Sequence, residues 1–257
     1  MEEKKWGLSS FALKRIAVLS MVIDHVGSIV LRGMLTPLQV DGVIAVGPES
    51  AEWVRRVFQA REVCDALGAV AFPIFCFLIA EGFTHTRDRG KYTLRMLLFA
   101  LLSEVPFDLA HYQTFFSPRL QNVMFTLTVS LLTLTALDWA GRRAGENRGL
   151  CGALTAAFTA AGMALAYLVR GEYVFIGVLA VVLMYLLRER GKLWLLGLVP
   201  LLVASPWVLL AVPLLLAYDG SRGRGNKWAF YVFYPAHFLV LAALAHLAAG
   251  YISGVLS

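Results

Sequence analysis

Apolar runs of membrane-spanning length recur along almost the whole chain and restrict it to one architecture. Hydrophobic residues make up 59% of the sequence and charged residues 16%, whereas soluble domains carry roughly 25% charged residues. Only helices and closed barrels satisfy their backbone polar groups in a bilayer, and a helix needs about 20 residues to cross it. The sequence therefore predicts an all-α, polytopic transmembrane helical bundle, formed as a single domain by residues 1–257.

Nine runs are candidates to cross the membrane, although several are shorter than 20 residues. Ser205-Pro206 joins the seventh and eighth runs, so these are either two tilted helices or one re-entrant hairpin. The nine predicted spans are Ile16–Leu31, Ala66–Ala80, Leu94–Ala110, Val123–Leu137, Leu150–Val169, Tyr173–Leu187, Leu193–Ala204, Trp207–Tyr218 and Trp228–Ala249.

Lysine and arginine residues concentrate in every second connection, and this asymmetry predicts the orientation of the bundle. Lys4 and Lys5 mark the N-terminus as cytoplasmic, and the connections on that side hold most of the remaining basic residues. The net charge of +6 is thus explained by orientation, so we expect membrane lipids and no nucleic acid as partners.

The arginine-rich first connection is the exception. There Trp53, Val57 and Ala60 form an apolar stripe, which predicts an amphipathic helix on the outer surface.

Ionisable residues lie near the middle of the first and last spans. Asp24 and His25 are about ten residues, or roughly 15 Å, from the predicted cytoplasmic end of the first span. His237 lies at a similar depth in the last span, on one helix face with Tyr234. A charged group at such a depth costs roughly 2.5–3.5 kcal/mol on insertion scales, which marks these residues as functional candidates.

A second polar group lies at the predicted cytoplasmic mouth. Glu81 and His85 are four residues apart at the end of the second span, and Lys91 and Arg95 repeat this spacing at the start of the third. With Arg87 they form a cluster that suits a ligand bearing phosphate groups, because arginine binds phosphate in a bidentate manner. A connection that only orients the bundle would look the same.

Two carboxylates occupy the outer half of the third span. Glu104 and Asp108 share one helix face beside Pro106, and Asn122 is expected at the same level. To relieve the cost of a buried charge, the two carboxylates would be protonated and neutral, would pair with a cation, or would bind an amine. Cations, histidines and carboxylates then follow one another across the membrane, as expected of a transporter or of an enzyme with a cytosolic donor.

At these residues the chain resembles the TraX family of membrane acetyltransferases. The matching blocks are Leu13–Ala17, Met21–Gly27, Ala71–Phe77, Glu81–Phe83, His85-Thr86, Lys91-Tyr92, Arg95, Ser103–Asp108, Asn122, Phe125-Thr126 and Phe233–His237. The chain departs from the family's pattern at Gly68-Ala69 and at Glu172-Tyr173-Val174. These departures concern the acceptor more than the chemistry.

The family is known for acetylating the N-terminal amine of a conjugative pilin in the inner membrane. The resemblance implies a multi-pass acetyltransferase of the bacterial inner membrane, with acetyl-CoA as donor. The acceptor would be a peptide or pilin amine, or a hydroxyl.

A small proton-coupled transporter or flippase is the alternative function, and a purely structural membrane protein is another. A transporter would need no acetyl-CoA, and no metal site is expected.

The resemblance also implies roles for the residues singled out above. His25 would act as the general base, His237 would polarise the thioester carbonyl, and Asp24 would set the local charge. The residues expected to bind the acetyl-CoA donor are Arg95, Lys91, Arg87 and His85, and those expected to bind the acceptor are Glu104, Asp108, Asn122, Glu81 and Tyr234.

Overall fold

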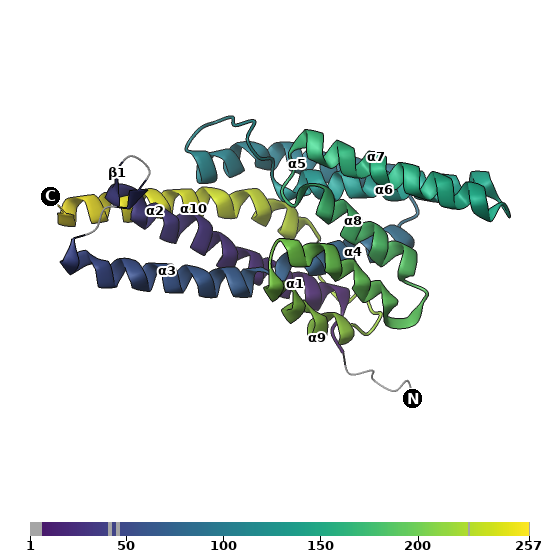
Figure 1. Cartoon of the computed structure of the whole chain (residues 1–257), viewed down its shortest axis with the longest axis horizontal. Helices are drawn as coiled ribbons and strands as arrows, with labels where there is room; N and C mark the ends of the chain where they lie inside the picture. Colours follow the sequence, from purple (N-terminus) through teal and green to yellow (C-terminus); the bar gives the residue numbers. More distant parts are fainter. Residues whose placement is uncertain (1–6, 41–42, 45–46, 226, 257) are drawn as a thin grey trace.

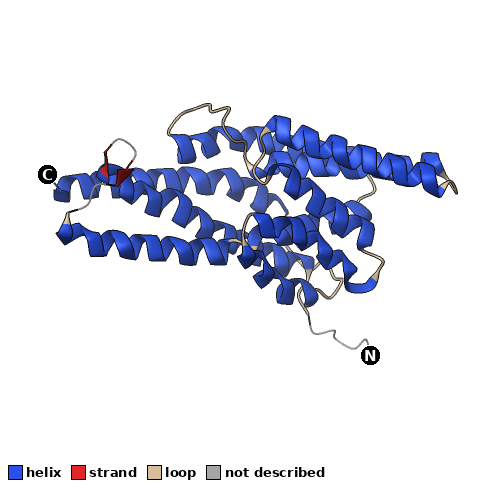
Figure 2. Cartoon of the chain, viewed as in Figure 1, coloured by secondary structure: helices blue, strands red, loops and turns tan. Residues whose placement is uncertain are grey.

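The computed structural model describes residues 7–40, 43–44, 47–225 and 227–256, so Lys4 and Lys5 lie outside the described residues. Helices account for nearly all of the described chain (Figure 2). Its strands are β1 (Gln39–Val40) and β2 (Val43–Ile44), which pair in an antiparallel hairpin of two residues each. The prediction of an all-helical fold is confirmed.

The longer helices run along the long axis of the molecule (Figure 1). The first half of the chain contains α1 (Ser10–His25), the π-helical turn η1 (Val26–Leu31), α2 (Arg32–Leu35), η2 (Thr36–Leu38), α3 (Pro48–Gly68), α4 (Ala71–His85) and α5 (Arg89–Tyr112). The second half contains α6 (Val123–Ala144), α7 (Arg148–Val169), α8 (Val174–Leu187), the 3₁₀ segments η3 (Gly191–Val203) and η4 (Pro206–Leu210), α9 (Ala211–Leu216) and α10 (Lys227–Leu256).

Five helical stretches of the described chain are long and apolar enough to cross a membrane, and three shorter apolar helices accompany them. The five are Ser10–Leu38, Ser50–His85, Val123–Ala144, Arg148–Val169 and Ala229–Gly254. Each of the nine predicted runs coincides with helical structure, although Ala66–Ala80 straddles the junction of α3 and α4. The count of nine crossings and the cytoplasmic N-terminus stay predictions.

The prediction for the first connection is wrong. Helix α3 does not lie apart on the surface but packs along α1 and η1 and leads directly into α4 (Figure 1). Val54 and Val57 are buried against Leu35 and Leu38, with Trp53 packed beside them. The apolar stripe therefore has a protein partner, because α2 and η2 return along the same side of α3.

Helix α1 meets the end of α3 at a close crossing that fixes the position of His25. The Ser20 hydroxyl donates to the Leu67 carbonyl at 2.5 Å. A Cβ on Gly68 would lie 2.4 Å from Asp24 Oδ1, and one on Gly27 would lie 2.7 Å from the Cβ of Cys64. Small residues thus let the two helices approach. The π-helical turn η1 begins immediately after His25, and such turns are frequent at functional sites.

Helices α6 and α7 pack through a second close contact. A Cβ on Gly162 would lie 2.0 Å from the hydroxyl oxygen of Thr133 and 3.1 Å from its Cβ. Ala166, one turn later on α7, is fully buried. The opposite face of α7 carries exposed apolar side chains, including Leu168 and Tyr167. The Gly162 contact therefore holds α7 onto the bundle.

Gly162→Val is expected to destabilise the protein by about 1–3 kcal/mol, because the new side chain overpacks this contact. The matched control is Gly152→Val on the same helix, where a Cβ meets nothing within 4 Å. Thermal unfolding in detergent, followed by circular dichroism, measures both changes. Equal melting temperatures for the two variants would contradict the assignment.

Candidate functional site

Two buried histidines from opposite ends of the chain meet at the centre of the molecule. His25 Nδ1 lies 2.8 Å from His237 Nε2, and their rings stack with centroids 5.1 Å apart. Only 5% of His25 and 6% of His237 is exposed. Phe238 covers the His25 ring at 4.8 Å and the His237 ring at 4.1 Å. The pair joins α1 to α10 within an aromatic environment.

The hydrogen bonds of this pair assign the proton positions for neutral rings. His237 Nδ1 lies 3.3 Å from the Phe233 carbonyl oxygen, which can only accept a hydrogen bond. His237 Nδ1 therefore carries the hydrogen, and His237 Nε2 accepts from His25 Nδ1. His25 Nε2 is left with a free lone pair. This nitrogen is the basic atom of the site.

His25 borders a small chamber of about 30 Å³ that also contains two carboxylates. Asp24 Oδ2 lies 4.0 Å from His25 Nε2, a distance too long for a direct hydrogen bond. Glu172, in the short connection between α7 and α8, forms another wall of the chamber. Burial and the nearby Asp24 carboxylate raise the pKa of Glu172 to about 7. The chamber thus combines a free imidazole nitrogen with two groups able to bear negative charge.

A cleft of about 500 Å³ with a cationic lining lies toward the start of α1. Lys14, Arg95 and Arg222 provide three cations, and Glu81 provides a carboxylate. The Glu81 carboxylate accepts from the Tyr218 hydroxyl at 3.0 Å and lies 3.1 Å from His85 Nε2. We call this space the cationic cleft. Its net charge and width suit a bulky anion.

The loop after α9 completes the cationic cleft. The backbone N–H of Ser10 donates to the Ser221 carbonyl at 2.8 Å, and that of Phe11 donates to the Arg222 carbonyl at 3.2 Å. These bonds fix Arg222 beside the first turn of α1. Lys14, one turn further along, extends over the ring of Phe230 at 5.1 Å.

An apolar throat of about 130 Å³ separates the cationic cleft from the chamber. Its walls include four residues of the cleft and three residues of the chamber. The residues shared with the cleft are Lys14, Leu78, Tyr92 and Phe230, and those shared with the chamber are Met21, Phe75 and Val123. The three cavities therefore form a row along α1.

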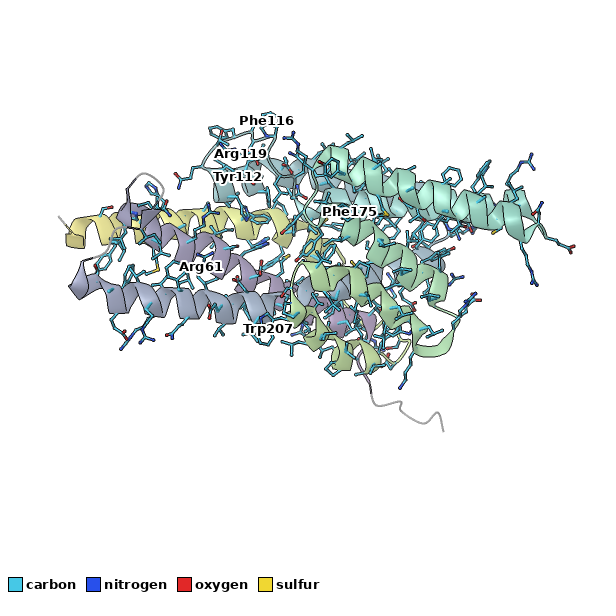
Figure 3. The ribbon with its side chains drawn as sticks, viewed as in Figure 1. Arg61, Tyr112, Phe116, Arg119, Phe175 and Trp207 are labelled. Atoms are coloured by element: carbon cyan, nitrogen blue, oxygen red, sulfur yellow. The ribbon has the colours of Figure 1, made fainter. Side chains whose placement is uncertain are left out.

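A fourth cavity lies beyond the chamber. It measures about 420 Å³, shares Asp24 and Tyr173 with the chamber, and is lined by Glu62 and Asp65 of α3. Trp207, at the start of η4, is another residue of its lining, and Figure 3 labels this residue near the end of α3. We call this space the acidic vestibule. Cationic cleft and acidic vestibule thus lie on opposite sides of His25.

The structure brings together only some of the residues expected to bind the donor. Arg95 and His85 line the cationic cleft, and Glu81 does so as well. Lys91 is paired with Asp88 at 3.1 Å and is not part of the cleft lining. Arg87 is exposed and lies outside that lining too.

The residues expected to bind the acceptor have structural partners. The Asn122 side chain donates to Glu104 Oε2 at 2.5 Å and to the Ala100 carbonyl at 2.9 Å. Asp108 Oδ2 accepts from the backbone N–H of Ser117 at 2.7 Å. These contacts hold the loop between α5 and α6. Tyr234 differs, since it borders the throat.

Sequence reasoning missed four residues that line the cavities. Lys14 lies in the block Leu13–Ala17 but was given no role, and Arg222 lies within a glycine-rich loop without a local motif. Glu172 gave a signal as a departure from the family's pattern, and Asp65 gave none. His111 of α5 also places its ring near the site, 6.0 Å from that of His25.

Comparisons with known proteins agree with this picture of the chain. The sequence model described as "TraX protein" matches residues 9–245. A protein of Dichelobacter nodosus, named "Probable fimbrial assembly protein FimC, serogroup H1", is 29% identical over 262 residues, which cover 91% of this chain and 95% of the relative. No solved structure matches the chain.

Proposed function

The chain belongs to the TraX family, and on that premise we propose that it is a membrane acetyltransferase that moves an acetyl group from acetyl-CoA to an amine. One observation carries the proposal. His25, whose Nε2 has the free lone pair, lines a chamber that lies between a throat with a cationic entrance and an acidic vestibule. A base is thus positioned between a site for an anionic donor and a site for a cationic acceptor.

The donor end of the row fits the chemistry of acetyl-CoA. Arg95 and Arg222 offer planar donors for the phosphate groups, and Lys14 adds a third cation. The apolar throat suits the extended pantetheine arm. Lys14 and His25 are eleven positions apart on α1, or about 16 Å at 1.5 Å per residue. An arm bound through the throat delivers its thioester to the junction of the throat and the chamber.

His25 Nε2 then acts as the general base. The ammonium group of the bound acceptor first gives one proton to the Asp24 carboxylate, which releases it to water. His25 Nε2 then accepts a proton from the resulting neutral amine while the lone pair of that nitrogen forms a bond to the thioester carbon. The carbon–oxygen π electrons move onto the oxygen. When the carbonyl re-forms, the carbon–sulfur bond breaks, and the sulfur leaves with its electron pair and takes the proton from His25. The products are an amide and free coenzyme A.

The acceptor is assigned to the acidic vestibule. Asp65, Glu62 and Asp24 offer carboxylates to an ammonium group, and Asp24 lies beside His25. Glu104 and Asp108 were the sequence-based choice, but their contacts with Asn122 and Ser117 favour a structural role. The D. nodosus relative is named for fimbrial assembly. This name supports a pilin-like peptide with a free N-terminal amine as the acceptor.

His25→Ala is expected to lower acetyl transfer by about 10²–10⁴-fold, because the general base is lost. The purified protein in lipid vesicles is incubated with radiolabelled acetyl-CoA and a peptide bearing a free N-terminal amine, and labelled peptide is counted. His246→Ala is the matched control, since His246 is exposed near the far end of α10. Full activity of His25→Ala would remove the base assignment. No acetyl-CoA-dependent product from wild type would favour a transporter.

Arg95→Gln and Lys14→Gln are each expected to raise the KM for acetyl-CoA about tenfold or more, because a hydrogen bond to a charged group is worth roughly 1.5–3 kcal/mol. Arg143→Gln, at the exposed tip of α6, is the control. A truncated donor, S-acetyl-N-acetylcysteamine, lacks the phosphates. Its KM should be the same for all four proteins. A rise with the truncated donor as well would contradict phosphate binding in the cationic cleft.

Asp65→Asn and Glu62→Gln are expected to raise the KM for the amine acceptor several-fold and to leave the KM for acetyl-CoA unchanged. Glu52→Gln is the matched control on the same helix, because Glu52 pairs with Arg55 and Arg56 at the exposed end of α3. Initial rates measured against both substrates separate the effects. An unchanged acceptor KM would show that the amine binds elsewhere.

A further inference from the structure

The histidine pair leaves one catalytic task without a residue. His237 was expected to polarise the thioester carbonyl, which requires an N–H directed at its oxygen. Its Nδ1 hydrogen is directed at the Phe233 carbonyl, and its Nε2 accepts from His25 Nδ1. His237 is therefore a positioning residue that orients His25. Another group must donate to the oxygen on which charge develops.

Tyr234 has a hydroxyl available for this task. The residue is only 4% exposed, and its hydroxyl is buried. The backbone of Val123 lies close enough to donate to the hydroxyl oxygen, but the hydroxyl hydrogen has no acceptor among the described residues. It belongs to the lining of the throat. A buried polar group without a partner is costly, and native structures rarely leave one without a reason. A ligand oxygen in the throat would provide the missing partner.

The position of Tyr234 along the throat favours the reacting end. Lys14 and Tyr92, the throat residues shared with the cationic cleft, mark its entrance. Tyr231, which also lines the throat, is three residues before Tyr234 on α10. Tyr234 is therefore about 4.5 Å further along the helix than Tyr231. The walls common to throat and chamber are formed by Met21, Phe75 and Val123, whose side chains donate no hydrogen bond.

Aromatic contacts fix the tyrosine ring relative to the histidine pair. Its centroid lies 5.5 Å from that of His237 and 5.3 Å from that of Phe238, which it meets edge to face. Tyr234 and His237 are three residues apart and share one face of α10. One helix face thus orients the base and places a tyrosine in the lining of the throat.

We propose that Tyr234 is a second catalytic residue, whose hydroxyl donates a hydrogen bond to the thioester oxygen during acetyl transfer. The proposal rests on the proposed function. As the acceptor nitrogen bonds to the thioester carbon, the π electrons move onto this oxygen and the Tyr234 O–H stabilises the charge. The tyrosine keeps its proton throughout, because the protons that leave the acceptor nitrogen pass to Asp24 and to His25.

The test compares Tyr234→Phe with wild type in steady-state transfer and in the infrared spectrum of a bound ligand. The ligand is the ketone analogue of acetyl-CoA, with CH₂ in place of sulfur and ¹³C in its carbonyl group. Loss of one donor to a developing oxyanion is expected to lower kcat by about 10²–10³-fold, with little change in KM. Wild type should lower the carbonyl stretching frequency of the ketone, and Tyr234→Phe should abolish that shift.

Tyr167→Phe is the matched control, because Tyr167 is 65% exposed on the outer face of α7. Melting temperatures in detergent show that each variant folds. If wild type is active and Tyr234→Phe has the same kcat and carbonyl frequency as wild type, the role of Tyr234 is overturned and the proposed function stays intact. A wild type that neither binds the ketone nor transfers acetyl overturns both.

Discussion

The hydrogen bond between His25 and His237 is the interaction on which the rest of the site depends. It joins the first long helix to the last at 2.8 Å, and the Phe233 carbonyl determines its direction. If His237 had the other tautomer, it would donate from Nε2 and His25 would have to accept through Nδ1. The free lone pair on His25 Nε2 therefore originates in the backbone of α10. Burial around Phe238 keeps water from competing for these bonds.

Charge is divided around this hydrogen bond. Cations line the space toward the start of α1, and carboxylates line the space toward α3 and η4. A donor rich in phosphate and an acceptor bearing an ammonium group are thus attracted to different ends of one row of cavities. In the proposed reaction, the apolar throat between them would keep the thioester away from bulk water and so limit hydrolysis. This division is a stronger argument for group transfer between two substrates than the presence of buried histidines.

Local patterns in the sequence predicted the helices and the central polar residues well. Apolar periodicity and length act over one helix at a time, so the depth of His25 and His237 followed from counting residues along their spans. The surface position of α3 was wrong because its apolar residues Val54 and Val57 pack against Leu35 and Leu38, a contact between two helices. A window that covers one helix does not contain both partners of such a contact.

The same limit applied to the site. Spacing placed Lys91 with Arg95, but Asp88, three residues before Lys91, pairs with the lysine. Arg222 reaches the cationic cleft only because the loop before α10 bonds to the backbone of α1. Tyr173 and Asp65, which meet in the acidic vestibule, are brought together by packing between separate helices. Residues that belong to one helix face were therefore predictable, whereas cavities built from several helices were not.

A cryo-electron microscopy structure of the protein in a lipid nanodisc with the non-hydrolysable ketone analogue of acetyl-CoA tests the central claim most directly. The account predicts density for the phosphates beside Lys14, Arg95 and Arg222, and an arm that follows the throat. The carbonyl carbon should then lie at the junction of the throat and the chamber, within reach of an acceptor bound to His25 Nε2. Nucleotide density on another surface, or a throat that stays closed at saturating ligand, would contradict it.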